Sequence, residues 1–199
     1  GTQNLRNVKV PLAIISPYEH HSVEVSLREG LCDIERIGLD ENGEIDIHNL
    51  KQILKLNAKR KIIACFSAAS NVTGIKSDYK EIYRLVKEYG GIFALDAATL
   101  SAYENVDCKY FDALFLSPHK LLGGVGSCGL LAIKKELCND VPTFAAGGTV
   151  KYVSRTSHLF VNEFEHLEEG GTPPIIQLIR ANLAYKLRNE IGFEVIKKA

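Results

Sequence analysis

The chain has 199 residues, the size of one ordinary domain, and 46% of them are hydrophobic, which is enough to form a buried core. Lysine plus arginine and aspartate plus glutamate number 24 each, so the chain lacks the basic field that nucleic acid or an anionic membrane surface requires. The composition excludes a disordered chain and a nucleic-acid-binding protein. The remaining candidate ligands are small molecules and other proteins.

The five cysteines are odd in number and widely spaced, and no C-x-x-C pair suggests a zinc or redox site. We therefore expect no metal site and a reducing compartment, with the cytoplasm as the simplest choice and an organelle left open. No apolar run reaches the roughly 18 residues that span a bilayer, so we expect no membrane contact. The sequence contains no methionine and reaches a strand-like run after a short polar lead, which we interpret as the mark of a fragment.

The first predicted elements are two strands and a helix. Val8–Ser16 is a nearly continuous apolar run, as expected for a strand covered on both faces. Cys32–Leu39 can form a second strand, and Asp40–Gly43 supplies turn residues after it. The turn leads to a helix that we expect Asp46 to cap.

The same alternation continues in the middle of the chain. Lys61–Phe66 predicts a third buried strand, and the following helix is expected to begin with Ser77 as its cap and to end at Gly90. Gly91–Leu95 then predicts a fourth buried strand.

The last predicted strands are Ala113–Leu116 and Gly129–Ile133, and the pattern is less regular from Lys134 until Thr172. Thr172 is expected to cap a final helix that opens with two prolines. Strands that alternate with helices predict an α/β fold with a mostly parallel, mixed sheet flanked by helices. We expect a single domain over residues 1–199.

Ligands of open α/β sheets bind beyond the carboxyl ends of the strands, so polar residues that follow apolar runs are the first candidates for a site. Four such places follow predicted strands: Glu19-His20-His21, Ser70-Asn71, Asp96, and Ser117-Pro118-His119-Lys120.

Lys120 is the candidate nucleophile. An arbitrary lysine is usually a solvated surface residue. Lys120, however, follows a buried strand, stands next to His119 and precedes a glycine-rich stretch, so partial desolvation can make its amine nucleophilic.

The other candidates each have two interpretations. Asp96 ends an apolar run and could pair with a cationic ring nitrogen of a ligand, or it could cap the segment that begins at Ala97. His20 could lie flat on an aromatic ring, or it could be an ordinary packed or surface residue. Asn71 could bond a phenolic oxygen, or it could form a turn that ends at Gly74.

In their joint order, the motifs E-H-H, S-N-V-T-G, L-D-A-A and S-P-H-K resemble the class V aminotransferase and cysteine desulfurase-like family of fold-type I pyridoxal 5'-phosphate (PLP) enzymes. The resemblance implies that Lys120 forms the internal aldimine with PLP and that Asp96 pairs with the pyridine nitrogen. It also implies that His20 stacks on the ring and that Asn71 contacts the cofactor. Lys120 and His20 are the expected catalytic residues.

The resemblance extends to residues 147–149 and 169–173. Gly147-Gly148-Thr149 resembles the G-G-[ST] segment that reaches the cofactor phosphate of the neighbouring subunit, and Glu169–Pro173 resembles the E-x-G-T-P turn of the family. A homodimer is therefore implied, in which Thr149 helps Ser117 and His119 of the other chain to hold the phosphate. Thr99 stands where many desulfurase-like members have glutamine, and its shorter side chain is expected to reach the phenolic oxygen less directly.

The family also has parts that do not occur in this sequence: a Gly-x-Thr helix start before E-H-H, and a C-terminal small domain with an arginine for the substrate carboxylate. The resemblance therefore implies that residues 1–199 are the large, cofactor-binding domain, truncated at both ends. The persulfide-forming cysteine of desulfurases belongs to the missing C-terminal part, so none of the five cysteines is assigned that role.

The function implied is that of a PLP-dependent transferase or lyase acting on an amino acid, with the fragment itself inactive. One alternative is a catalytically incomplete PLP-type domain that acts as a binding or dimerisation module. The other is a nicotinamide-dependent oxidoreductase on the same type of sheet, which the composition allows; Gly124, Gly126 and Gly129 also fit the pattern G-x-G-x-x-G. A strand-like run rather than a helix follows Gly129, so we interpret these glycines as turn positions beside the cofactor.

Overall fold

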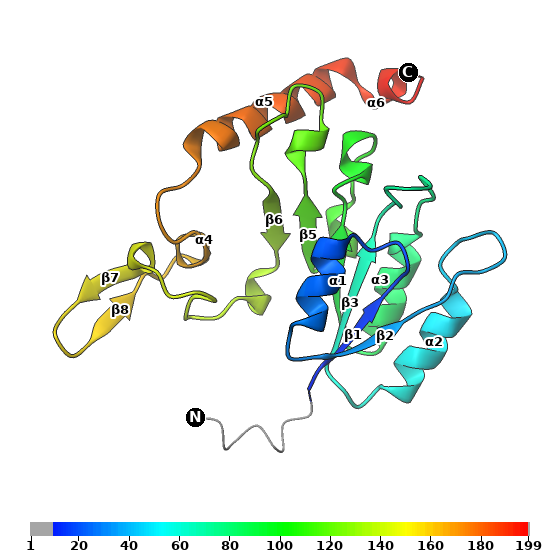
Figure 1. The fold of residues 1–199 in the computed structure, drawn as a ribbon, viewed down its shortest axis with the longest axis horizontal. Helices are drawn as coiled ribbons and strands as arrows, with labels where there is room; N and C mark the ends of the chain where they lie inside the picture. Colours follow the sequence, from blue (N-terminus) through cyan, green and yellow to red (C-terminus); the bar gives the residue numbers. More distant parts are fainter. Residues whose placement is uncertain (1–9, 199) are drawn as a thin grey trace.

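The structure, a computed structural model, describes residues 10–198 (Figure 1). The first two residues of the predicted strand Val8–Ser16 lie outside the described residues. The strands are β1 (Leu12–Ile15), β2 (Asp33–Arg36), β3 (Ile62–Ser67), β4 (Ile92–Asp96), β5 (Ala113–Leu116), β6 (Leu130–Ile133), β7 (Val150–Val153) and β8 (His158–Phe160). The α-helices are α1 (His21–Arg28), α2 (Ile47–Leu56), α3 (Tyr79–Glu88), α4 (Phe164–Glu168), α5 (Ile175–Ile191) and α6 (Phe193–Ile196).

The main sheet has six strands in the order β2-β1-β3-β4-β5-β6. Strands β1 to β5 run parallel, and β6 pairs with β5 in the antiparallel direction. Strands β7 and β8 form a separate antiparallel hairpin. The prediction of an α/β fold with a mostly parallel, mixed sheet is confirmed.

Helices cover both faces of the sheet, and successive strand residues point to opposite faces. On one face, Ile14 and Phe66 pack in the larger core, which includes Leu50 of α2 and Ile82 of α3. On the other face, Ile15, Cys65, Ala94 and Ala113 form a smaller cluster against Val23 and Leu27 of α1. Figure 1 shows α1 on the opposite side of the sheet from α2 and α3.

A buried carboxylate ties the antiparallel edge strand to the parallel part of the sheet. Asp112, just before β5, accepts hydrogen bonds from Lys134 after β6 at 2.7 Å and from Lys87 of α3 at 2.9 Å. Burial opposes ionisation of Asp112, but the two ammonium groups and the Phe93 N–H hold the pKa of the carboxyl below its ordinary value. The network lies at the amino end of β5, away from the carboxyl ends of the strands.

Two predicted helix caps are wrong and one is confirmed. Asp46 caps α2 by accepting the Asn49 N–H at 2.9 Å. Helix α3 is capped by Asp78 instead of Ser77, whose buried hydroxyl donates to a backbone carbonyl of β3. Helix α5 begins at Ile175 with Pro174 in the cap position, so Thr172 does not cap it.

Candidate active site

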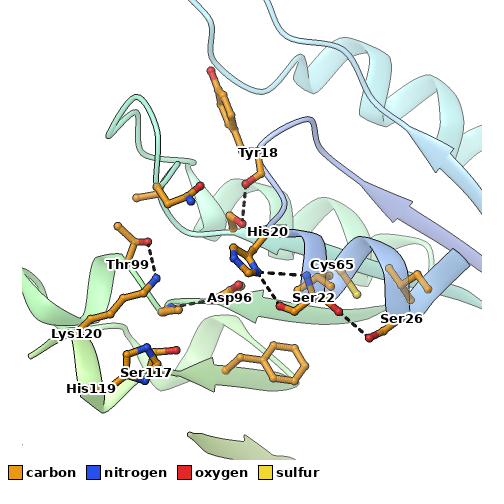
Figure 2. A pocket seen from close by; sticks show the side chains of 17 residues that line it. Tyr18, His20, Ser22, Ser26, Cys65, Asp96, Thr99, Ser117, His119 and Lys120 are labelled. Carbon is orange, nitrogen blue, oxygen red and sulfur yellow. Dashed lines mark hydrogen bonds between the residues drawn. The ribbon is translucent and has the colours of Figure 1, made fainter. Parts of the chain in front are cut away.

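A cavity of about 530 Å³ lies at the carboxyl ends of the parallel strands, within the usual size range of ligand pockets (Figure 2). Its walls come from the segments that follow β1, β3, β4 and β5, together with the adjoining face of α1. The lining residues include seven that the sequence singled out: His20, Asn71, Asp96, Thr99, Ser117, His119 and Lys120.

Strand register explains why residues far apart in sequence meet here. Ser67 at the end of β3 stands beside Asp96 at the end of β4, and Asp96 stands beside Phe115 of β5. Strand β1 lies between β2 and β3, so the direction of the chain connections reverses at β1. Ligands of open α/β sheets bind at such a switch point, and the segment carrying His20 begins there.

Lys120 projects into the cavity from the short 3₁₀ helix η4 (Pro118–Lys120) that follows β5. Its Nζ lies 3.5 Å from the hydroxyl oxygen of Thr99. The loop after η4 packs so closely that a Cβ added at Gly124 would lie 1.9 Å from the Pro118 carbonyl oxygen. Any side chain at position 124 would therefore push the loop away from η4, the helix that carries Lys120.

Asp96 makes the capping contact that the sequence allowed, and its pairing with a ring nitrogen of a ligand stays a prediction. Its Oδ1 accepts the backbone N–H of Ala98 at 2.8 Å, which is the turn-forming role expected of an aspartate at this position. Within residues 10–198, the protein hydrogen bonds of this carboxylate involve Oδ1 alone, and the half-buried side chain lines the cavity. Oδ2 thus has no protein hydrogen bond among these residues.

His20 lines the cavity and also caps α1. Its Nδ1 accepts the backbone N–H of Ser22 at 3.2 Å and lies 2.9 Å from the Ser22 hydroxyl oxygen. The sequence did not predict α1, because the cap is an imidazole rather than one of the usual Ser, Thr, Asp or Asn residues.

Asn71 belongs to the turn that the sequence allowed. The Ser70 hydroxyl oxygen accepts the N–H groups of Val72 and Thr73, and Gly74 closes the turn with φ of +74°. The turn leaves the Asn71 side chain exposed at the cavity, where its amide can contact a ligand.

Ser117 and His119 line the same cavity, but Thr149 does not. Thr149 lies in the 3₁₀ helix η6 (Gly147–Thr149), is fully buried, and donates its hydroxyl to the Ala146 carbonyl oxygen at 2.6 Å. A role for Thr149 in the site of a second subunit stays a prediction.

Glu19 is a buried residue beside the cavity, and the sequence gave it no role. Its Oε1 accepts the Ser16 hydroxyl at 2.6 Å and the Ser67 N–H at 3.1 Å, and its Oε2 accepts the Ser67 hydroxyl at 2.8 Å. These bonds tie the segment before His20 to β3. Burial outweighs the hydrogen bonds and raises the pKa of Glu19 above its ordinary value. The signal available in the sequence was a carboxylate directly before the candidate histidine.

Cys65 of β3 also lines the cavity. Burial, with a contribution from the nearby Glu19 carboxylate, raises the pKa of Cys65 to about 12. A thiol with such a pKa carries almost no thiolate near neutral pH and is a poor nucleophile.

A family model described as "Aminotransferase class-V" matches residues 9–199. A "Probable cysteine desulfurase" from Pyrococcus abyssi is 32% identical over 193 residues, covering 93% of this chain and 47% of that relative. A protein of the same name from Streptomyces coelicolor is 29% identical over 191 residues, covering 92% of this chain and 44% of the relative. The chain thus spans about half the length of the curated relatives it matches.

Solved structures agree with this match. The apo structure of a cysteine desulfurase from Thermococcus onnurineus superposes with a TM-score of 0.81 at 27% identity, covering 94% of this chain and 47% of that one. A cysteine desulfurase from Escherichia coli superposes with a TM-score of 0.82 at 23% identity, which supports the fold alone. With a family model matched over nearly its whole length and the fold of these structures, the chain belongs to the class V aminotransferase family.

Proposed function

We propose that the protein is a PLP-dependent enzyme that acts on an amino acid, as a transferase or a lyase of the cysteine desulfurase-like kind. The observation that carries the proposal is the convergence of an amine, a carboxylate with one free oxygen and an imidazole on one cavity: Lys120, Asp96 and His20. The chain spans about half the length of the relatives it matches. The activity of the whole protein is therefore also proposed.

The residues of the cavity fit a phosphorylated pyridine aldehyde. The volume of about 530 Å³ suits a single aromatic ring with room for a small substrate. Phe115 and Val23 give apolar walls, and Ser117 and His119 offer hydrogen-bonding groups for a phosphate at one side. When bound, PLP supplies an electron sink that stabilises negative charge at the α-carbon of the substrate.

Each proposed role belongs to a residue that lines the cavity. The Lys120 amine, beside Thr99, would hold the cofactor covalently and would move a proton to or from the substrate α-carbon. Asp96 Oδ2 would keep a proton on the pyridine nitrogen. His20 would cover one face of the ring and exclude water, while Asn71 and Thr99 would contact the phenolic oxygen.

The proposal includes a homodimer, in which Thr149 of a second copy completes the phosphate site. Helix α5 exposes a series of large apolar side chains, and a contiguous apolar surface of this kind is usually covered by protein. These residues are Ile175, Ile176, Ile179 and Leu183.

The choice of reaction follows from the relatives, which are named cysteine desulfurases. We therefore propose L-cysteine as the first substrate to test. Cys65 is not suited to accept the sulfur, because its raised pKa leaves almost no thiolate. A desulfurase would need an acceptor thiol other than Cys65.

The test is to incubate the full-length protein with PLP and either L-cysteine or L-alanine plus a keto acid. With a thiol reductant such as dithiothreitol present to release the transferred sulfur as sulfide, formation of alanine and sulfide from cysteine would support a desulfurase, and amino-group transfer would support an aminotransferase. A protein that binds no PLP, or that binds PLP and turns over neither substrate, would contradict the proposal. The second of these outcomes would favour a domain that acts only as a binding module.

A further inference from the structure

His20 caps helix α1 in an unusual way. The residue adopts an extended backbone, with φ of −65° and ψ of 145°, and its own side chain satisfies an N–H of the first helical turn. A side chain can satisfy an N–H group only through an atom with a free lone pair. An imidazole can therefore cap a helix only through a ring nitrogen that carries no proton.

The two neutral forms of His20 can be compared with this geometry. If the proton is on Nε2, Nδ1 accepts the Ser22 N–H at 3.2 Å and the Ser22 hydroxyl at 2.9 Å. If the proton is on Nδ1, that N–H can donate to the Ser22 hydroxyl oxygen, but it faces the Ser22 backbone N–H at 3.2 Å. The second form leaves a helix N–H without an acceptor and sets two donors against each other, so the first form is favoured.

We propose that Ser22 is a positioning residue that fixes His20 in the form protonated at Nε2, so that the ring exchanges protons with the cavity at Nε2 alone. The exchange of this proton with a ligand rests on the proposed function. The assignment of the proton to Nε2 rests only on the contacts between His20 and Ser22. Ser22 acts through His20, whose fixed ring would meet the substrate or cofactor.

The surroundings of Ser22 hold this arrangement in place. The Ser26 hydroxyl, one turn further along α1, donates to the Ser22 carbonyl oxygen at 2.6 Å. Figure 2 shows the Ser22 contacts on one edge of the His20 ring, while the opposite edge faces the side of the cavity from which Lys120 and Thr99 project. A flip of the ring would break both contacts of Nδ1, so it is opposed by the helix itself.

The experiment is ¹⁵N NMR of the full-length, cofactor-free protein labelled at histidine, recorded at alkaline pH where imidazole is neutral. The two neutral forms have distinct patterns of ring-nitrogen shifts and couplings. The signals of His20 are assigned by their loss in His20→Asn, a variant that can still cap α1 with its side-chain oxygen. The expected result is a His20 ring protonated at Nε2, and a ring protonated mainly at Nδ1 would overturn the proposal.

Two variants distinguish a direct effect of the residue 22 side chain on His20 from the effect of a negative charge placed anywhere on α1. Ser22→Asp puts an acceptor-only carboxylate beside Nδ1 at a helix position that favours negative charge, so we expect the proton to appear on Nδ1. Val25→Asp adds the same charge on an exposed side chain further along α1, leaves the Ser26 contact intact, and is expected to leave His20 protonated at Nε2. No change in Ser22→Asp, or the same change in both variants, would contradict the role of Ser22. Because the measurement needs no PLP, failure of the proposed function would be seen separately, as failure to bind PLP.

Discussion

In the proposed function, Asp96 serves the fold and the site together. Its Oδ1 holds the turn after β4 through the Ala98 N–H, and the proposal assigns Oδ2 to the ligand. An asparagine can keep the turn through its side-chain oxygen, but it presents an N–H₂ group or a neutral oxygen to the ligand. The structural and the chemical functions of Asp96 can therefore be separated by one substitution.

We predict that Asp96→Asn lowers kcat by about 10²-fold or more while changing the stability of the protein little, because a neutral amide cannot hold the proton of a cationic ring nitrogen. Steady-state kinetics and thermal unfolding of the same preparations would measure both effects. Unchanged kinetics would mean that Asp96 serves only the turn.

The raised pKa of Glu19 leads to a prediction of how the stability of the fold depends on pH. Its pKa is raised above the ordinary value of 4.5 in the folded protein, so the folded state holds this proton more tightly than the unfolded state. The contribution of Glu19 to stability is therefore most favourable below pH 4.5 and declines as the pH rises through the folded-state pKa. We expect Glu19→Gln to remove this decline, as measured by denaturant unfolding across the acid range.

Glu41 provides a matched control for this experiment, because it is an exposed glutamate in the turn before α2. Glu41→Gln is expected to leave the pH profile of stability as it is in the native protein. A Glu19→Gln profile parallel to the native one would show that burial does not disfavour the ionised form of Glu19.

Many residues that line the cavity could be predicted one by one from the sequence, because polar residues after buried strands meet at one edge of a parallel sheet. Asp96 and Lys120 are both found there. The capping of α1 by His20 could not be predicted, because an imidazole is not a typical cap and its contacts depend on the position of Ser22. The buried state of Thr149 also depends on tertiary packing that no local pattern encodes.

At the scale of elements, the short helix η4 sets the position of Lys120. Its loop returns so tightly that Gly124 packs against the Pro118 carbonyl. We predict that Gly124→Ala displaces η4 and lowers activity by about 10²-fold, because a shift of about 1 Å in a reacting group costs this much. The rate of covalent PLP attachment would fall as well.

Gly129 is the control, because a Cβ there would meet its nearest neighbour, the Leu116 carbonyl oxygen, at an ordinary 3.8 Å. Gly129→Ala is expected to keep most of the activity and of the PLP attachment rate. Equal losses in both variants would mean that the packing of η4 on Gly124 does not decide the position of Lys120.

Sequence patterns predicted the main strands well because each is a short apolar run bounded by polar residues, and Ala113–Leu116 matches β5 in full. Helix α1 was missed because it is short and none of its residues is fully buried. The pattern after Gly129 was interpreted correctly as a strand: Leu130–Ile133 forms β6. The glycine pattern there therefore does not open a helix, as a dinucleotide site would require.

At the scale of the whole molecule, within residues 10–198 no helix is both long and apolar enough to cross a membrane. The five cysteines carry free thiols. The backbone N–H and the hydroxyl of Thr149 both donate to the Ala146 carbonyl oxygen, so a role in a second subunit requires η6 to rearrange when the dimer forms.

We predict that Lys120→Ala and Thr149→Ala are each weakly active in the full-length protein, and that mixing the two variants restores activity. A mixed dimer has one site with a native Lys120 and a native Thr149, so random exchange would restore about a quarter of the native activity. Full activity of Thr149→Ala alone, or no recovery on mixing, would contradict a shared site.

The central claim is that Lys120 is the lysine that binds PLP. The most direct measurement is to saturate the protein with PLP, reduce with borohydride, digest the product and identify the modified lysine by mass spectrometry. We predict that the modification is found chiefly on Lys120 and that Lys120→Ala loses it, together with at least about 10³-fold of activity in the full-length protein. Modification spread over surface lysines, or an equal yield from Lys120→Ala, would contradict the assignment.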